Sequence, residues 1–238
     1  MFKVKMLVLF LLVALLVGCT PPGIPISGSG NVVTQEEDIS AFDKLDVSEA
    51  FKVDIRQGET FSVVVRVDDN LVKYLQVIKE GNTLKIGLKP GISVRAATRQ
   101  AEVTMPELAG LDLSGASRAS ITGFKSTKSL DVDVSGASQL RGDIEAGNAR
   151  FAAEGAGEVT LRGSAGDLTV NAAGASTVDL ADFPVADANV EAIGASEVTV
   201  NASGRLDADA SGASDVYYLG NPTLGTVDTS GASSVKPK

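Results

Sequence analysis

The feature that most constrains this chain is a short repeat built around the dipeptide Gly-Ala. The glycine of this dipeptide recurs at positions 115, 136, 155, 174, 194, 212 and 231, a nearly constant spacing along the chain. In most copies the dipeptide lies inside Ser-Gly-Ala-Ser. Such a unit is shorter than a βαβ unit of about 30 residues or a propeller blade of about 40. The repeat therefore favours an architecture in which short units stack and share one core.

Apolar residues alternate with polar ones on both sides of each Gly-Ala. Four residues before the glycine stand Leu111, Val132, Phe151, Val170, Val190, Ala208 and Val227, and four residues after it stand Ala119, Leu140, Val159, Val178, Val198, Val216 and Val235. A period of two is typical of a strand with one buried face. We therefore predict an all-β protein, a parallel β-helix (solenoid) with coils of about 19 residues that is regular over residues 107–238.

The Gly-Ala bend has a predicted role at the corner between the two strands of a coil. Glycine turns the chain without steric strain, and the alanine is expected to point inward, where a larger side chain would overpack the bend. The flanking serines are expected to cap backbone groups or to form ladders. At the end of the stack, Lys236, Pro237 and Lys238 are predicted to act as a cap, because Lys and Pro discourage pairing at a sheet edge.

Residues 31–106 alternate as strands do, but without the regular repeat. The stretch from Leu45 to Phe51 resembles the stretch from Leu111 to Ser117, which predicts that the solenoid begins near residue 40. The alternative is a separate β-sandwich that precedes the solenoid. The irregular loop from Lys89 to Gln100, with Arg95 and Arg99, is interpreted as a mobile surface loop.

The segment 1–18 reads as an export signal. Lys3 and Lys5 precede an unbroken apolar run from Met6 to Val17. A membrane-spanning helix needs about 20 apolar residues, so this shorter run is predicted to be part of a signal peptide, residues 1–18, that is removed. Residues 19–30 are rich in Pro, Gly and Ser, and they are expected to form a flexible tether.

The signal ends in Leu16-Val17-Gly18-Cys19, which resembles the bacterial lipobox. This resemblance implies that Cys19 is lipidated and becomes the first residue of the mature protein. Several acyl chains make such an anchor stable. Since Thr20 is not the aspartate that favours retention in the inner membrane, the outer membrane is the predicted location. An ordinary secretory signal with an incidental cysteine is the alternative.

Composition excludes several classes of function. The chain has no His and one Cys, so neither a Ser-His-Asp triad nor an intrachain disulfide is available. The formal net charge is −9, and it becomes −11 without residues 1–18, which contain two lysines and no acid. This charge argues against a nucleic-acid partner and against electrostatic adhesion to anionic lipid.

The order of motifs resembles one known family. The motifs are Phe42-Asp-Lys-Leu-Asp-Val-Ser, Phe51-Lys-Val-Asp-Ile, Asn82-Thr-Leu-Lys-Ile and Val103-Thr-Met-Pro-Glu-Leu, followed by the Ser-Gly-Ala-Ser repeats. Together they are similar to the putative auto-transporter adhesin, head GIN domain family, over roughly residues 40–235. The resemblance implies an exported β-helical protein and supplies no catalytic residues.

Acidic residues recur three positions before the corner glycine. Glu191, Asp209 and Asp228 would form a ladder if the coils stack in register, and Asp112 and Asp133 would form a second pair. Like charges opposite each other are destabilising, and bound Ca²⁺ would relieve their repulsion. The ladder is therefore a candidate calcium site, with a solvated acidic face as the alternative. No other cofactor is predicted.

Two functions remain open from the sequence. The first is a non-catalytic surface module of the cell envelope, adhesin-like or scaffolding, that binds a glycan or a protein along a flat face. The second is a polysaccharide lyase or hydrolase built on a β-helix, which rests on analogy between folds. An enzyme of this kind is expected to interrupt its repeat with a cluster of functional groups, and the repeat here is uninterrupted from 109 to 235.

Overall fold

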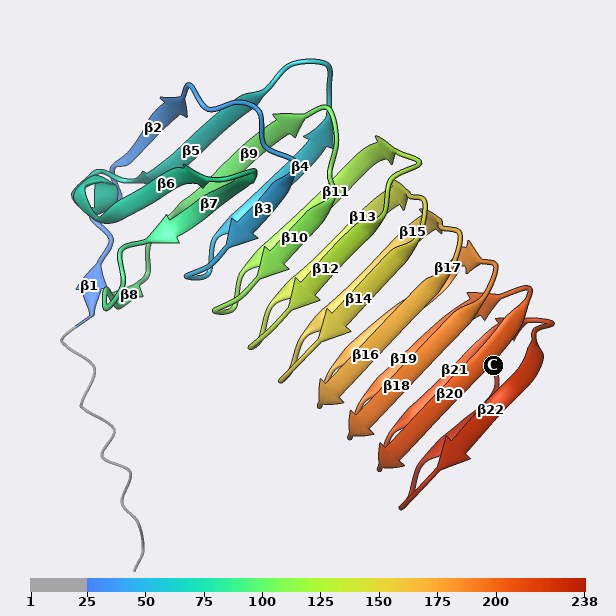
Figure 1. The fold of residues 1–238 in the computed structure, drawn as a ribbon. Coiled ribbons are helices and arrows are strands. Elements are labelled where there is room, and N and C mark those ends of the chain that lie inside the picture. The colour runs from blue at the N-terminus through green and yellow to red at the C-terminus, as the bar shows by residue number, and fades with distance from the viewer. Residues whose placement is uncertain (1–24) are drawn as a thin grey trace, which may run out of the picture.

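The computed structural model describes residues 25–238, and it confirms the predicted parallel β-solenoid (Figure 1). Each regular coil contributes one strand to each of two long sheets. The ten-stranded sheet contains, in order, β6 (Leu75–Glu80), β7 (Thr83–Leu88), β3 (Lys44–Val47), β10 (Gly110–Leu113), β12 (Leu130–Val134), β14 (Ala149–Ala153), β16 (Leu168–Gly174), β18 (Ala188–Gly194), β20 (Arg205–Gly212) and β22 (Thr223–Thr229).

The second sheet has eleven strands and lies against the first. Its order is β2 (Val32–Glu37), β5 (Ser62–Asp68), β9 (Arg99–Met105), β4 (Lys52–Gln57), β11 (Arg118–Lys125), β13 (Gln139–Glu145), β15 (Glu158–Ser164), β17 (Thr177–Val185), β19 (Glu197–Ala202), β21 (Asp215–Gly220) and β23 (Ser234–Pro237). A short pair, β1 (Ile26–Ser27) with β8 (Val94–Arg95), and the 3₁₀ helix η1 (Asp69–Tyr74) lie outside both sheets.

The repeat columns of the sequence become rows of stacked side chains. Leu111 lies opposite Val132, which lies opposite Phe151, and all three are buried. The ring of Phe151 also meets that of Phe183 edge-on, with 5.8 Å between the ring centroids. One coil has too few neighbours to bury its apolar face, so the core exists only because the coils stack.

The corner glycines are piled on one another, and this close approach requires glycine. Gly174, Gly194 and Gly212 are in register across β16, β18 and β20. A Cβ added to Gly174 would lie 2.7 Å from the carbonyl oxygen of Gly155, and its φ of +84° also disfavours other residues.

The prediction that the corner alanines point inward is wrong. The alanines that follow the corner glycines are exposed, and the residue after each alanine is the one that turns into the core. At five corners this residue is a buried serine: Ser117, Ser138, Ser176, Ser196 and Ser214. An inward residue at this bend lies beside backbone N–H groups of the adjacent coil, and a hydroxyl satisfies them where a methyl group does not.

The irregular part, residues 31–106, contributes strands to the same two sheets. β3 pairs with β10, with Leu45 opposite Leu111. The coil formed by β7 and β9 stacks on the other side of β3 and β4, so the coils are not in chain order. β2, β5 and β6 are antiparallel additions that form this N-terminal end of the stack.

The opposite end is formed by β22 and β23. Lys236 and Pro237, predicted as part of a cap, belong to β23 itself. Leu224 and Val227 occupy inward positions of the last coil, yet they remain 48% and 38% exposed. The final coil therefore leaves part of its apolar edge open.

The described chain begins at the N-terminal end of the stack. Ile26 and Ser27 pair with Val94 and Arg95, so residues 26–30 of the expected tether belong to the folded unit. The signal peptide and Cys19 lie outside the described residues. In the part that is described, no helix has the length and apolar character needed to cross a membrane.

Candidate functional site

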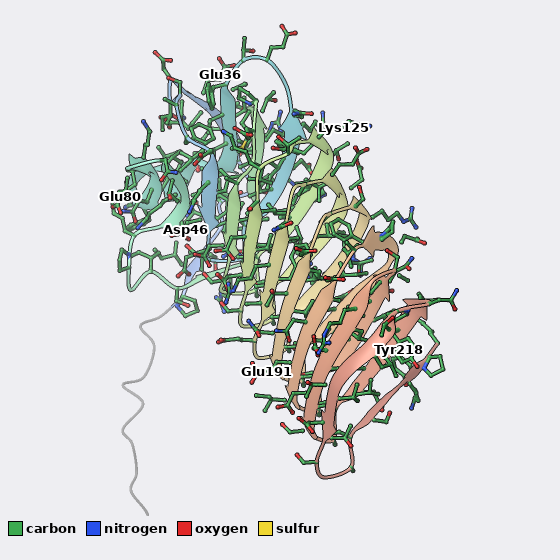
Figure 2. The ribbon with its side chains drawn as sticks, turned by 45° about the vertical axis from the view of Figure 1, so that its right-hand side comes forward. Glu36, Asp46, Glu80, Lys125, Glu191 and Tyr218 are labelled. Carbon is green, nitrogen blue, oxygen red and sulfur yellow. The ribbon has the colours of Figure 1, made fainter. Side chains whose placement is uncertain are left out.

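The outer face of the ten-stranded sheet carries a continuous row of outward side chains. We call it the acidic row; in stacking order it reads Lys85, Asp46, Asp112, Asp133, Ala152, Asn171, Glu191, Asp209 and Asp228. Figure 2 labels two of its members, Asp46 towards the N-terminal end and Glu191 further along the stack. The parallel register places each side chain directly beside the equivalent one in the next coil, about 4.8 Å away along the stack.

The three predicted calcium ligands are neighbours in this row. Glu191 lies opposite Asp209, and Asp209 lies opposite Asp228. All three residues are exposed. Among residues 25–238, however, no group of three acidic side chains converges in the manner of a metal site. The register expected from the sequence is therefore present, whereas Ca²⁺ binding stays a prediction.

A second acidic group lies nearer the N-terminal end. Asp112 lies between Asp46 and Asp133 in register, and Asp131 is close by on β12. Partial burial, followed by the repulsion of Asp133, Asp46 and Asp131, raises the pKa of Asp112. The repeat spacing pairs Asp112 with Asp133 and leaves out Asp46, whose sequence signal is the match of Leu45-Asp46 to Leu111-Asp112.

Cationic side chains border this second group. A small recess of about 90 Å³ is lined by Lys44, Gly110, Asp112, Asp131 and Asp133. Arg150 on β14 lies 2.9 Å from the Asp131 carboxylate and 3.7 Å from that of Asp133, measured from Nη1 to Oδ1. The hydrogen bond to Asp131 raises the pKa of Arg150. The repulsion is thus partly relieved by the protein's own cation.

Farther along the same face, Asp207 forms a bidentate pair with an arginine. Arg205 donates from Nε at 2.6 Å and from Nη2 at 2.7 Å to the two carboxylate oxygens. The N–H of Thr226 in the next coil also donates to this carboxylate, at 2.6 Å. These hydrogen bonds lower the pKa of Asp207 to about 2, with Arg205 the larger cause. This carboxylate is therefore already occupied.

The outer face of the eleven-stranded sheet has a different charge pattern. Its basic residues alternate with acidic ones and pair with them, as Arg141 does with Glu158 at 2.6 Å and Lys125 with Glu145 at 2.7 Å. A shallow recess of about 340 Å³ is lined by Arg141, Gly142, Asp143, Thr160 and Arg162. Acidic charge is thus concentrated on one face, and the other face is mixed.

The loop from Lys89 to Gln100 is tied down at several points. Strand β8 lies within it and pairs with β1, and Arg95 Nε donates to Ser27 Oγ at 2.9 Å. Arg99, about half-buried, donates from Nη1 to the carbonyl oxygen of Glu49 at 2.9 Å. Burial lowers the pKa of Arg99. The loop is a surface segment, as interpreted from the sequence, but its central part is paired.

A known protein family matches most of this chain. The model of the family described as "Putative auto-transporter adhesin, head GIN domain" matches residues 41–222. The chain belongs to this family. This confirms the resemblance noted in the sequence motifs. No functionally curated protein matches the chain.

Solved structures share the architecture. A putative adhesin from Bacteroides fragilis is 22% identical with a TM-score of 0.83, and the match covers 90% of this chain and 100% of that one. A putative lipid binding protein from Parabacteroides distasonis is 22% identical with a TM-score of 0.71 and the same coverage. A putative adhesin from Parabacteroides merdae is 18% identical with a TM-score of 0.67, covering 90% and 98% of the two chains. At these identities the likeness establishes the fold alone.

Proposed function

We propose that this family member is a lipid-anchored protein of the cell envelope, attached to the outer membrane through Cys19, that binds an extended ligand without transforming it. The observation that carries the proposal is the alignment of the acidic row across nine neighbouring strands, in which six of the nine positions hold Asp or Glu. This face offers a carboxylate at most coils, while Lys85, Ala152 and Asn171 occupy the other positions of the row. It suits an elongated glycan or protein rather than a small substrate held in a cleft.

The chemistry of the chain supports a binding role over a catalytic one. The sequence has no His, and its carboxylates are spaced by the repeat rather than drawn together across a reacting group. The adhesin names of the family and of two solved relatives agree with this role. The alternative, a polysaccharide-active enzyme, would have to use the recess lined by Asp112, Asp131 and Asp133, two of whose carboxylates already pair with Arg150.

Two experiments test the proposal. Mass spectrometry of the protein purified from membranes should find acyl groups on an N-terminal Cys19, and a Cys19→Ala variant should be neither acylated nor membrane-bound. The mature protein should then be applied to a glycan array and assayed against the same polysaccharides for lyase and hydrolase activity. Saturable binding without turnover is expected. Release of new reducing ends or unsaturated products would overturn the non-catalytic assignment.

A further inference from the structure

One part of the N-terminal end of the solenoid is basic, although the chain as a whole is acidic. Residues 69–100, which form η1, β6, β7 and the loop containing β8, hold six basic and two acidic side chains, a net charge of +4. The other residues of 19–238 carry a net charge of −15. The overall charge, which argues against adhesion to anionic lipid, therefore hides a basic region at one end.

Three exposed cations of this region lie on segments that are linked by hydrogen bonds to the point where the described chain begins. We call Lys73, Lys89 and Arg95 the tether-side basic cluster. Lys89 Nζ donates to the carbonyl oxygen of Lys73 at 2.7 Å, which places these two residues together. Arg95 donates to Ser27 Oγ at 2.9 Å, and Asn70 Nδ2 donates to the carbonyl oxygen of Ser27 at 2.9 Å. Because Asn70 and Lys73 share one short helix, these bonds link the cluster to β1 (Figure 1).

The two acidic groups next to β1, Asp68 and Asp69, are already engaged in hydrogen bonds. The buried carboxylate of Asp68 accepts the N–H groups of Gly30 at 3.1 Å and Thr98 at 3.2 Å. Asp69 accepts a hydrogen bond from Ser29 Oγ, and this bond lowers the pKa of Asp69. These bonds fix the start of the chain against η1, so the exposed cations keep a constant position relative to it.

Chain length decides how near this end lies to the anchor. Six residue steps separate Cys19 from Pro25, the first described residue. Even fully extended they span roughly 20 Å at most, given about 3.5 Å per residue. The far end of the stack is about 40 Å beyond, since eight strand steps of about 4.8 Å separate β7 from β22.

We propose that the tether-side basic cluster docks on the anionic phospholipid surface of the anchoring membrane, so that the solenoid stands on its N-terminal end. This rests on the proposed anchor at Cys19. Anionic headgroups are the partner that the cations fit, because a juxtamembrane Lys or Arg strengthens binding to such a surface roughly fivefold each. The acidic rest of the molecule is repelled by the same surface, which favours the upright orientation over one lying flat.

The experiment uses the lipidated protein in vesicles, with acylation of Cys19 verified first by mass spectrometry. A single fluorophore is attached through Ser93→Cys, beside the cluster, or through Ser230→Cys, at the far end. Energy transfer to headgroup-labelled lipid is then measured. In vesicles with about one third anionic lipid, we expect strong transfer from position 93 and weak transfer from position 230. Neutral lipid or about 0.5 M salt should reduce the transfer from position 93.

A pair of matched variants separates the cluster from charge in general. Lys73→Gln, Lys89→Gln and Arg95→Gln together should reduce transfer from position 93 to its value on neutral lipid. Arg118→Gln, Arg141→Gln and Arg162→Gln, which remove the same charge from the outer face of the eleven-stranded sheet, should leave it unchanged. Acylated protein whose transfer ignores lipid charge, salt and both variants would overturn the docking proposal alone. Protein without acyl groups would overturn the anchor as well.

Discussion

The backbone N–H of Ser196 donates to Oγ of Ser214 in the following coil, with an N···O distance of 3.3 Å. The same arrangement joins Ser117 to Ser138 and Ser214 to Ser233, both at 3.2 Å. The hydroxyl of Ser196 in turn donates to the carbonyl oxygen of Ile193 at 3.0 Å. Ser196 and Ser214 thus bond both to their own corner and to the neighbouring coil, which explains why a polar residue is buried at these bends.

Removing one hydroxyl from this ladder should destabilise the fold. Ser214→Ala leaves the N–H of Ser196 without its acceptor, and we expect a loss of about 1–2 kcal/mol in the free energy of unfolding, measured by urea denaturation. Ala213→Ser is the matched control, since it alters the exposed residue of the same corner and should change stability by less than about 0.5 kcal/mol. Equal effects of the two changes would contradict the assignment of the inward position.

The stacked corner glycines permit a test that separates the backbone strain of a positive φ from the steric clash of an added Cβ with the adjacent coil. Gly123 and Gly174 have similar φ angles, +82° and +84°. A Cβ on Gly123 would meet no atom within 4 Å, whereas one on Gly174 would lie 2.7 Å from the Gly155 carbonyl oxygen. Gly123→Ala should therefore cost only the backbone strain, about 1–2 kcal/mol. Gly174→Ala should cost clearly more, as a larger fall in Tm. If both cost the same, the coils do not approach as closely as described.

The raised pKa of Asp112 fixes the sign of a pH effect. A carboxyl with a raised pKa binds its proton more tightly in the folded state, so stability falls as pH rises through the window just above the ordinary aspartate value. Asp112→Asn should therefore raise Tm at pH 7 and make no difference near pH 3. The gain should stay below about 1 kcal/mol, because the side chain is partly exposed and screened.

Asp207 should behave in the opposite way. Its pKa is lowered to about 2, so its contribution to stability is present at pH 7 and is lost as pH falls from about 4 towards 2. Asp207→Asn should lower Tm at pH 7 and lose its effect at the acidic limit. Thermal unfolding of the Asp112→Asn and Asp207→Asn variants, each measured separately from about pH 2 to about pH 7, tests both predictions. If both variants changed Tm at pH 7 in the same direction, the pairing of Asp207 with Arg205 would be contradicted.

Calcium binding by Glu191, Asp209 and Asp228 has a direct test. A site of the weak extracellular kind, with a Kd of about 10⁻⁴–10⁻³ M, should raise Tm when about 5 mM Ca²⁺ is added. Glu191→Gln, Asp209→Asn and Asp228→Asn together should abolish that rise. Asp112→Asn with Asp133→Asn, on the same face, should preserve it. An unchanged Tm in the original protein would leave the ladder as a solvated acidic face.

Much of the fold could be predicted because the spacing of the repeat indicates which residues of successive coils lie side by side. Leu111, Val132 and Phe151 recur at one spacing, and only stacked coils bury them all. At the corner, the alanine was predicted to point inward because a small side chain fits a tight bend. The deciding factor is hydrogen bonding instead, since the buried N–H of Ser196 needs an acceptor. Burial alternates through a bend less simply than through a strand, so the pattern alone did not decide between Ala195 and Ser196.

The candidate site was predictable in register but not in environment. The spacing placed Glu191, Asp209 and Asp228 in one row. The match of Leu45-Asp46 to Leu111-Asp112 is the sequence signal that Asp46 belongs to the row. The repeat spacing alone does not give it, because the strands from β4 to β9 lie between β3 and β10 in the chain. The basic region at the N-terminal end was likewise dispersed over η1, β7 and β8. The structure links these segments through the bond from Lys89 to Lys73 and through that from Arg95 to Ser27.

The position of β3 and β4 limits how this protein can change in length. These strands form the first coil in chain order, yet they lie between the coil of β7 and β9 and the coil of β10 and β11. A repeat inserted or deleted there would break pairings on both of its sides at once. Beyond β12, each coil touches only the coil before it and the coil after it in the chain. Growth or shortening by whole repeats is therefore open to the C-terminal half of the solenoid and closed to its beginning.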